Sequence, residues 1–222
     1  MGEVISMDEA RELVANSALW PKVRAFVWDF APAVHSSWLG ESEKTALARF
    51  PDSPRVKAAV LETLNVGEVF HKFPQDDFSR ICLLDSATLV TLVQWLGALV
   101  SLPVLRRTTS GAVVRALKAA LPDVYPSVLA FSAYFRDLAV ATPAPDASAD
   151  PAQVVAAGCQ ALSALLVNVP KAVLERLRLK LPREFDFGAG DSREDGSVSP
   201  VKPQNLLLLL KLKFPEAYAL CS

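Results

Sequence analysis

The chain has 222 residues, of which 51% are hydrophobic and 21% are charged, and its net charge at neutral pH is −1. This length and apolar content are enough to bury a core, and they exclude disorder over most of the chain. The near balance of 23 basic and 24 acidic side chains argues against a nucleic-acid-binding protein, which needs a surplus of Lys and Arg on one surface.

The N-terminal third of the sequence contains helix start and stop signals. Ser6 and Glu9 fit a capping box, and we expect the helix that follows to end at Trp20-Pro21. Ser53-Pro54 predicts a second helix, which runs to about Leu64, because proline suits the first helical position. The segment before Ser6 has no basic and apolar regions of a secretory signal, so we expect a cytoplasmic protein.

Residues 86–105 carry no formal charge. A bilayer span needs about 20 apolar residues, but Thr88, Thr91, Gln94, Ala98 and Ser101 recur at steps of three and four and collect on one helix face. Pro103 also breaks the helix before it is long enough to span. The pattern therefore favours a buried central helix over a membrane span.

Basic side chains gather directly after this helix. Arg106, Arg107, Arg115 and Lys118 surround a Thr-Thr-Ser-Gly turn, where Ser110 is placed to cap a helix over 112–121. Guanidinium groups pair with carboxylates or phosphates, and a helix N-terminus adds positive charge. The cluster is either a binding surface for an acidic partner or a solvated face with partners inside the chain.

Residues 141–151 are rich in Pro, Ala and Asp and predict a linker between two helical lobes, 1–140 and 152–222. Asp150-Pro151 then starts a helix to about Val167. The segment 187–200 is polar and rich in glycine, so we expect it to be flexible. Periodicity predicts about seven to nine helices and no sheet, hence an all-α, irregular multi-helix domain with one or two lobes.

Two segments of the C-terminal part leave alternatives open. Residues 170–182 begin like a helix, but Leu177, Leu179 and Leu181 alternate with basic residues as in a strand. The terminal helix carries five consecutive leucines from Leu206 to Leu210. These complete the chain's own core or contact a partner, in which case Leu206 and Leu210 are binding residues.

Reactive groups are scarce. His35 and His71 are the only histidines and lie outside metal-ligand spacing, and no hydrolase or nucleotide-binding motif is present. Cys82, Cys159 and Cys221 are far apart and predict reduced thiols. We expect no catalytic residue, no metal and no cofactor; a small enzyme with a site around His35 or His71 is the weakest hypothesis.

Three segments together resemble a known family. They are Leu96-Gly97 followed by Leu105-Arg106-Arg107, Gly111 and Val114-Arg115; the Leu177–Pro182 segment; and the basic, apolar ending Leu210–Ala217. This order and spacing are similar to the SctK family of type III secretion accessory proteins, which includes YscK, PscK, OrgA and MxiK. The five-leucine run is more apolar than the family pattern, and the aromatic residue that is frequent at the family's C-terminus is either replaced by Tyr218 or absent.

The resemblance implies a helical, non-enzymatic protein of the bacterial cytoplasm, at the base of the injectisome. Such proteins bridge the cytoplasmic forkhead-associated domain of the ring protein SctD and the pod protein SctQ in the sorting platform. The resemblance also implies protein partners and no membrane span. The alternative hypothesis is a helical chaperone or export regulator that holds an apolar client segment through the 206–210 helix.

Overall fold

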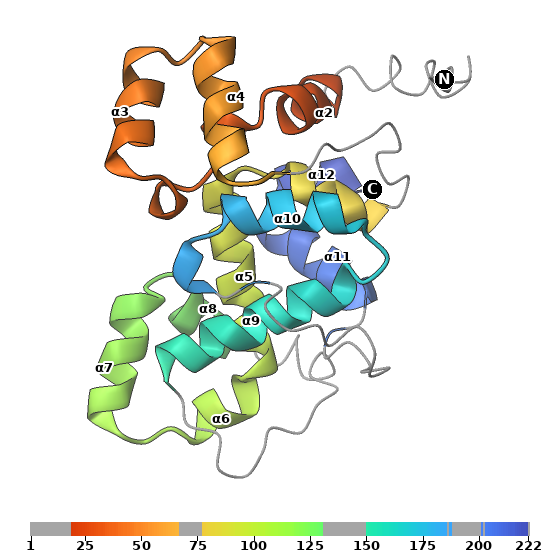
Figure 1. The fold of residues 1–222 in the computed structure, drawn as a ribbon. Helices are drawn as coiled ribbons and strands as arrows, with labels where there is room; N and C mark the ends of the chain where they lie inside the picture. The colour runs from red at the N-terminus through yellow and green to blue at the C-terminus, as the bar shows by residue number, and fades with distance from the viewer. Residues whose placement is uncertain are drawn as a thin grey trace.

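A computed structural model describes residues 19–66, 77–130, 150–185, 187, 201 and 203–221. In these ranges the chain forms α-helices and short 3-10 helices without a strand, which confirms the all-α prediction (Figure 1). The α-helices are α2 (Leu19–Trp28), α3 (Glu41–Arg49), α4 (Pro54–Thr63), α5 (Ser86–Val100), α6 (Leu102–Arg107), α7 (Gly111–Ala120), α8 (Val124–Ala130), α9 (Pro151–Leu165), α10 (Lys171–Lys180), α11 (Pro203–Lys213) and α12 (Pro215–Cys221). The 3-10 helices are η1 (Ala31–Ala33), η2 (Ser36–Trp38), η3 (Asp77–Leu83) and η4 (Arg183–Phe185). The described part thus holds more α-helices than predicted.

The uncharged stretch forms the centre of the molecule. Helix α5 begins after Asp85, whose carboxylate accepts a hydrogen bond of 2.8 Å from the backbone N–H of Thr88. It ends at Val100, and α6 starts immediately with Pro103 in its first turn, so the predicted break is confirmed. In the part of the chain that is described, no helix is both long and apolar enough to cross a bilayer.

Helices α5 and α9 cross at two glycines. A Cβ on Gly97 would overlap the carbonyl oxygen of Val154, and a Cβ on Gly158 would overlap the carbonyl oxygen of Val93. The backbones therefore touch where they cross, which only residues without a side chain allow. This crossing brings the main apolar faces of the two helices together.

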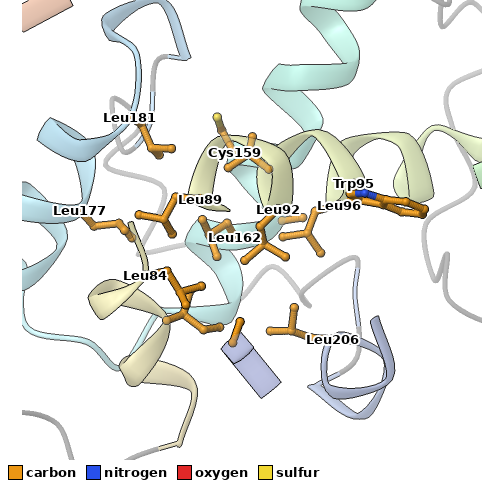
Figure 2. Close-up of a cluster of buried hydrophobic side chains, with 14 of the residues drawn as sticks. Leu84, Leu89, Leu92, Trp95, Leu96, Cys159, Leu162, Leu177, Leu181 and Leu206 are labelled. Carbon is orange, nitrogen blue, oxygen red and sulfur yellow. The ribbon is translucent and has the colours of Figure 1, made fainter. Parts of the chain in front are cut away.

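A single apolar core forms around this crossing. Leucines from α5, α9, α10 and α11 point toward one another in Figure 2, with Leu89, Leu96, Leu162, Leu177 and Leu206 fully buried. Cys82 and Cys159 are reduced and lie in the same core, while the side chain of Cys221 is outside the described part. The core thus draws on both sides of the predicted linker, whose residues 141–149 lie outside the described ranges. The division into two lobes stays a prediction.

The N-terminal helices lie at one end of the molecule and α6 and α7 at the other (Figure 1). Helix α4 starts at Pro54 after Ser53 and reaches its C-cap at Leu64, as predicted, although Ser53 makes no side-chain capping bond. It closes with Asn65 in the left-handed region at φ 50°. The N–H groups of Asn65 and Val66 then donate to Glu62 and Leu61, which is the geometry of a Schellman motif.

One predicted helix end is wrong. Trp20 and Pro21 were expected to end a helix, but they lie in the first turn of α2, which continues to Trp28. Proline is tolerated there because the first N–H groups of a helix have no partner within it. The capping box at Ser6 and Glu9 and the helix predicted after it lie, apart from Leu19, outside the described residues.

Candidate partner-binding surfaces

The predicted basic cluster is exposed. Arg106 and Arg107 occupy the last turn of α6, and Arg115 and Lys118 lie on α7, all four with exposed side chains. Among the described residues, none of the four has a carboxylate at ion-pair distance. The α6–α7 surface, defined by these residues, therefore keeps its charges for solvent or a partner. Its binding role stays a prediction.

The turn between the two helices adds to this positive surface. Ser110 is the N-cap of α7, but its side chain makes no capping bond, and Gly111 has open space where a Cβ would stand. The first N–H groups of α7 are thus reachable from outside beside the arginines. Such a helix start carries partial positive charge. An acidic group from a partner would meet both kinds of donor.

The leucines of α11 divide between the core and the surface. Leu206, Leu209 and Leu210 have no exposed surface, whereas Leu208 is 40% exposed and Leu212 is 52% exposed. Of the two interpretations of the sequence, the completion of the chain's own core therefore holds for Leu206 and Leu210 in this conformation. A partner of α11 would meet Leu208 and Leu212 instead.

Helix α10 resolves the ambiguous 170–182 segment and contains two buried cations that the sequence did not reveal. Arg176, only 5% exposed, donates from Nη1 to the carbonyl oxygens of Phe26 and, at 2.8 Å, Val27. Lys180, 4% exposed, donates from Nζ to the carbonyl oxygens of Leu84 and, at 2.9 Å, Cys82. Both cations therefore satisfy carbonyls at the C-terminal ends of α2 and η3, where positive charge is favourable.

Burial lowers the pKa of Lys180 to about 8, because water no longer stabilises the ammonium ion. The nearby Cys82 and Asp85 oppose this shift, and Lys22 adds to it. Burial also raises the pKa of Asp85, but hydrogen bonds from the Thr88 hydroxyl and N–H outweigh this effect, so its pKa lies below the ordinary value. The hydrogen bonds of Lys180 tie α10 to the end of η3, and those of Asp85 cap the start of α5.

The third basic residue of this segment faces outward. Arg178 is exposed, and its guanidinium carbon lies 5.1 Å from the ring centroid of Trp38 in η2. Arg183, at the start of η4, is also exposed and lies 5.5 Å from the same centroid. We call Trp38, Arg178 and Arg183 the Arg–Trp–Arg cluster. Trp38 lies far from the two arginines in the chain, so sequence spacing gave no signal for the cluster.

An aromatic hollow lies between α2 and α4. Its volume is about 580 Å³, and Trp20 and Trp28 form its wall with ring centroids 5.8 Å apart. Lys57 and Asp29 form an ion pair of 2.8 Å on its lining, so these two charges compensate each other. The hollow therefore exposes aromatic surface, and the Lys57–Asp29 pair adds no net charge to it.

The structure shows no convergence of reactive groups where it describes the chain. His35 shares a hydrogen bond of 2.9 Å with the Ser37 hydroxyl, and no metal-binding group of three His, Cys, Asp or Glu occurs among the described residues. His71 lies outside those residues. The features that are present, exposed arginines and aromatic rings, are typical of protein interfaces.

Comparison with known proteins identifies the family. The family model described as YOP proteins translocation protein K (YscK) matches residues 22–213, which is most of the chain. Comparison with curated proteins and with solved structures gives no significant match. The match includes helices α3 to α11, the first two segments that carry the resemblance seen in the sequence, and the third segment up to residue 213. The chain therefore belongs to the YscK family of type III secretion proteins.

Proposed function

We propose that this protein is a non-enzymatic adaptor of the injectisome sorting platform, which bridges the inner-membrane ring protein SctD and the pod protein SctQ at the cytoplasmic face of the apparatus. Membership of a secretion family supports protein transport as the setting. The observation that carries the adaptor role is the α6–α7 surface, where four exposed cations have no carboxylate at ion-pair distance within the described ranges.

The physical basis is charge complementarity on a rigid support. Arg106, Arg107 and Arg115 stand on short helices, and Leu105 and Leu117 from the same helices are buried in the core. A guanidinium pairs with a carboxylate through two parallel hydrogen bonds, which gives an interface both orientation and strength. An acidic face of SctQ or of the SctD cytoplasmic domain fits this surface.

The test is co-purification with SctQ and with the cytoplasmic domain of SctD from one secretion system. The wild-type chain is expected to bind both, separately and together. Arg106→Glu combined with Arg107→Glu should weaken one of the two contacts about tenfold or more, because like charges then face each other. The matched control is Arg55→Glu on α4, an exposed arginine at the opposite end of the molecule.

Binding to neither protein would contradict the adaptor role. If both proteins bind and the Arg106/Arg107 variant binds as the wild type does, the role stands but the surface is wrong. The Arg55→Glu control makes half of the change in net charge, so a general effect of charge would appear in it as about half of the loss in binding free energy. Circular dichroism of each variant confirms that its helices are intact.

The second candidate function, a chaperone or export regulator, is favoured by one observation. Leu208 and Leu212 are exposed on α11, four residues apart and hence on one face. Truncating α11 cannot test this function cleanly, since Leu206 and Leu210 belong to the core. Leu208→Ser with Leu212→Ser keeps the core and should abolish capture of an apolar client segment if this function is correct.

A further inference from the structure

The Arg–Trp–Arg cluster is held in place by backbone contacts between two distant segments. The indole Nε1 of Trp38 donates to the carbonyl oxygen of Leu181 at 2.8 Å. The backbone N–H of Arg183 donates to the Ser37 hydroxyl at 2.8 Å, and that of His35 donates to the carbonyl oxygen of Leu179 at 2.8 Å. The position of the ring is thus set before any partner arrives.

The two arginines of the cluster differ from their buried neighbours on α10 in the partners of their N–H groups. Arg176 and Lys180 direct N–H groups at backbone carbonyls inside the protein. Arg178 and Arg183 are exposed, and no described carboxylate lies at ion-pair distance from either. Glu184 follows Arg183 in the chain and is exposed, yet it forms no ion pair within the described part.

The indole ring orders these two cations. A guanidinium over a tryptophan face is attracted by the ring and is confined to fewer rotamers. The entropy lost when such a side chain is immobilised by a partner is then smaller than for a free arginine. Two ordered guanidinium groups on one partly buried ring provide several N–H donors, for which no acceptor is found among the residues that the structure describes.

We propose that the Arg–Trp–Arg cluster is a docking point for an acidic protein segment, in which Asp or Glu carboxylates pair with Arg178 and Arg183 and an apolar side chain packs beside Trp38. The inference rests on the proposed function, because it assigns the acidic segment to SctQ or to the SctD cytoplasmic domain. It adds a second contact surface to the α6–α7 surface. A bridging protein needs two surfaces that partners occupy together.

The chemistry favours carboxylates on a protein over a nucleic acid. Nucleic-acid binding relies on many cations spread along one surface, whereas this cluster has two, in a chain of net charge −1. Trp38 makes the site selective, since a planar aromatic ring between cations suits a short segment with one apolar residue. A phosphorylated segment would use the same guanidinium donors, and the experiment separates it from a carboxylate segment.

The experiment measures the affinity of the full chain for SctQ and for the SctD cytoplasmic domain by calorimetry. Arg178→Glu with Arg183→Glu should weaken one of the two complexes about tenfold or more. Arg178→Lys with Arg183→Lys should give an intermediate loss, because lysine keeps the charge but not the planar fork. Lys171→Glu is the matched control, an exposed cation at the start of the same helix α10.

A second measurement needs no substitution and so does not depend on the variants folding. Hydroxyl-radical footprinting of the wild-type chain should show Trp38 protected in one complex, with buried Trp95 as an internal reference. Treatment of the partner with a phosphatase should leave the affinity unchanged. An affinity lost on that treatment would overturn the carboxylate assignment.

The outcomes separate this inference from the proposed function. A wild-type chain that binds neither protein contradicts the proposed function itself. A wild-type chain that binds, together with unchanged affinity of the Arg178/Arg183 variant or an unprotected Trp38 in both complexes, overturns the docking point alone. A loss of half as much binding free energy or more with Lys171→Glu, which makes half of the change in net charge, would also overturn it, because the effect would then be one of net charge.

Discussion

Replacement of Gly97 by alanine is expected to destabilise the protein strongly, although it adds only one methyl group. The added Cβ would overlap the carbonyl oxygen of Val154 and lie 2.9 Å from the carbonyl carbon of the same residue. Both atoms belong to the backbone of α9, which cannot rotate away as a flexible side chain does. Helices α5 and α9 must therefore separate by roughly 1 Å.

The cost follows from the contacts that this separation weakens. A gap of about 1 Å removes up to half of each dispersion contact of about 0.1–0.2 kcal/mol, so that about 40 atom pairs lose about 3 kcal/mol together. Strain from overpacking adds about 1–3 kcal/mol, and the better helix propensity of alanine returns about 1 kcal/mol. We expect a net loss of about 4 kcal/mol, or a fall in Tm of about 8–16 °C for a protein of this size.

Thermal unfolding followed by circular dichroism measures the effect. Gly111→Ala is the matched control, because nothing lies within 4 Å of its Cβ position, and its Tm should stay within about 3 °C of the wild-type value. Gly158→Ala should resemble Gly97→Ala, and the double variant should cost less than the sum, since the first Cβ already separates the helices. An unchanged Tm for Gly97→Ala would refute the close crossing.

Three further predictions test the buried groups. The folded protein releases the Lys180 proton near pH 8, whereas the unfolded chain holds it to its ordinary pKa of 10.5, so stability should rise by about 1 kcal/mol from pH 7 to pH 9. Lys180→Met should lack that rise in urea unfolding at the two pH values, and an equal rise in the variant would contradict the low pKa. Arg176→Met leaves the carbonyls of Phe26 and Val27 without their donor and should lower the free energy of unfolding by about 3 kcal/mol. Hydrogen exchange of the backbone amides along α2 should then become faster. Unchanged exchange there would show that Arg176 does not hold α2. Leu206→Ala should lower the free energy of unfolding by about 2–5 kcal/mol, because the Leu206 side chain is fully buried. Leu208→Ala is the exposed control and should change it by less than about 1 kcal/mol. Equal losses would contradict the division of α11 between core and surface.

Local signals in the sequence predicted the elements that depend on local chemistry. Ser53-Pro54 and Asp150-Pro151 mark the starts of α4 and α9, because proline at the first helical position needs no partner for an N–H group. The absence of charge over 86–105 identified α5 as buried. The exposure of Arg106 and Arg107 follows from their place at the end of α6.

Features that depend on distant contacts escaped the sequence. Helix α10 was ambiguous because its leucines alternate with basic residues, as in a strand. In the structure two of these basic residues, Arg176 and Lys180, are buried on backbone carbonyls, so the basic residues do not mark the outer face of the helix. Trp20-Pro21 was misjudged, since the same dipeptide can end one helix or begin the next. The Arg–Trp–Arg cluster joins residues 143 positions apart through Trp38 and Leu181, a pairing that no periodicity contains.

The contact between Arg176 and α2 has a consequence for synthesis on the ribosome. The guanidinium reaches Phe26 across 150 positions of the chain, and at about 5–20 residues per second the ribosome needs about 8–30 s to add them. During that delay water alone can satisfy the last carbonyls of α2. The first helix of the described chain is thus among the last to be fixed, and a nascent chain halted before residue 176 should leave α2 open to proteases.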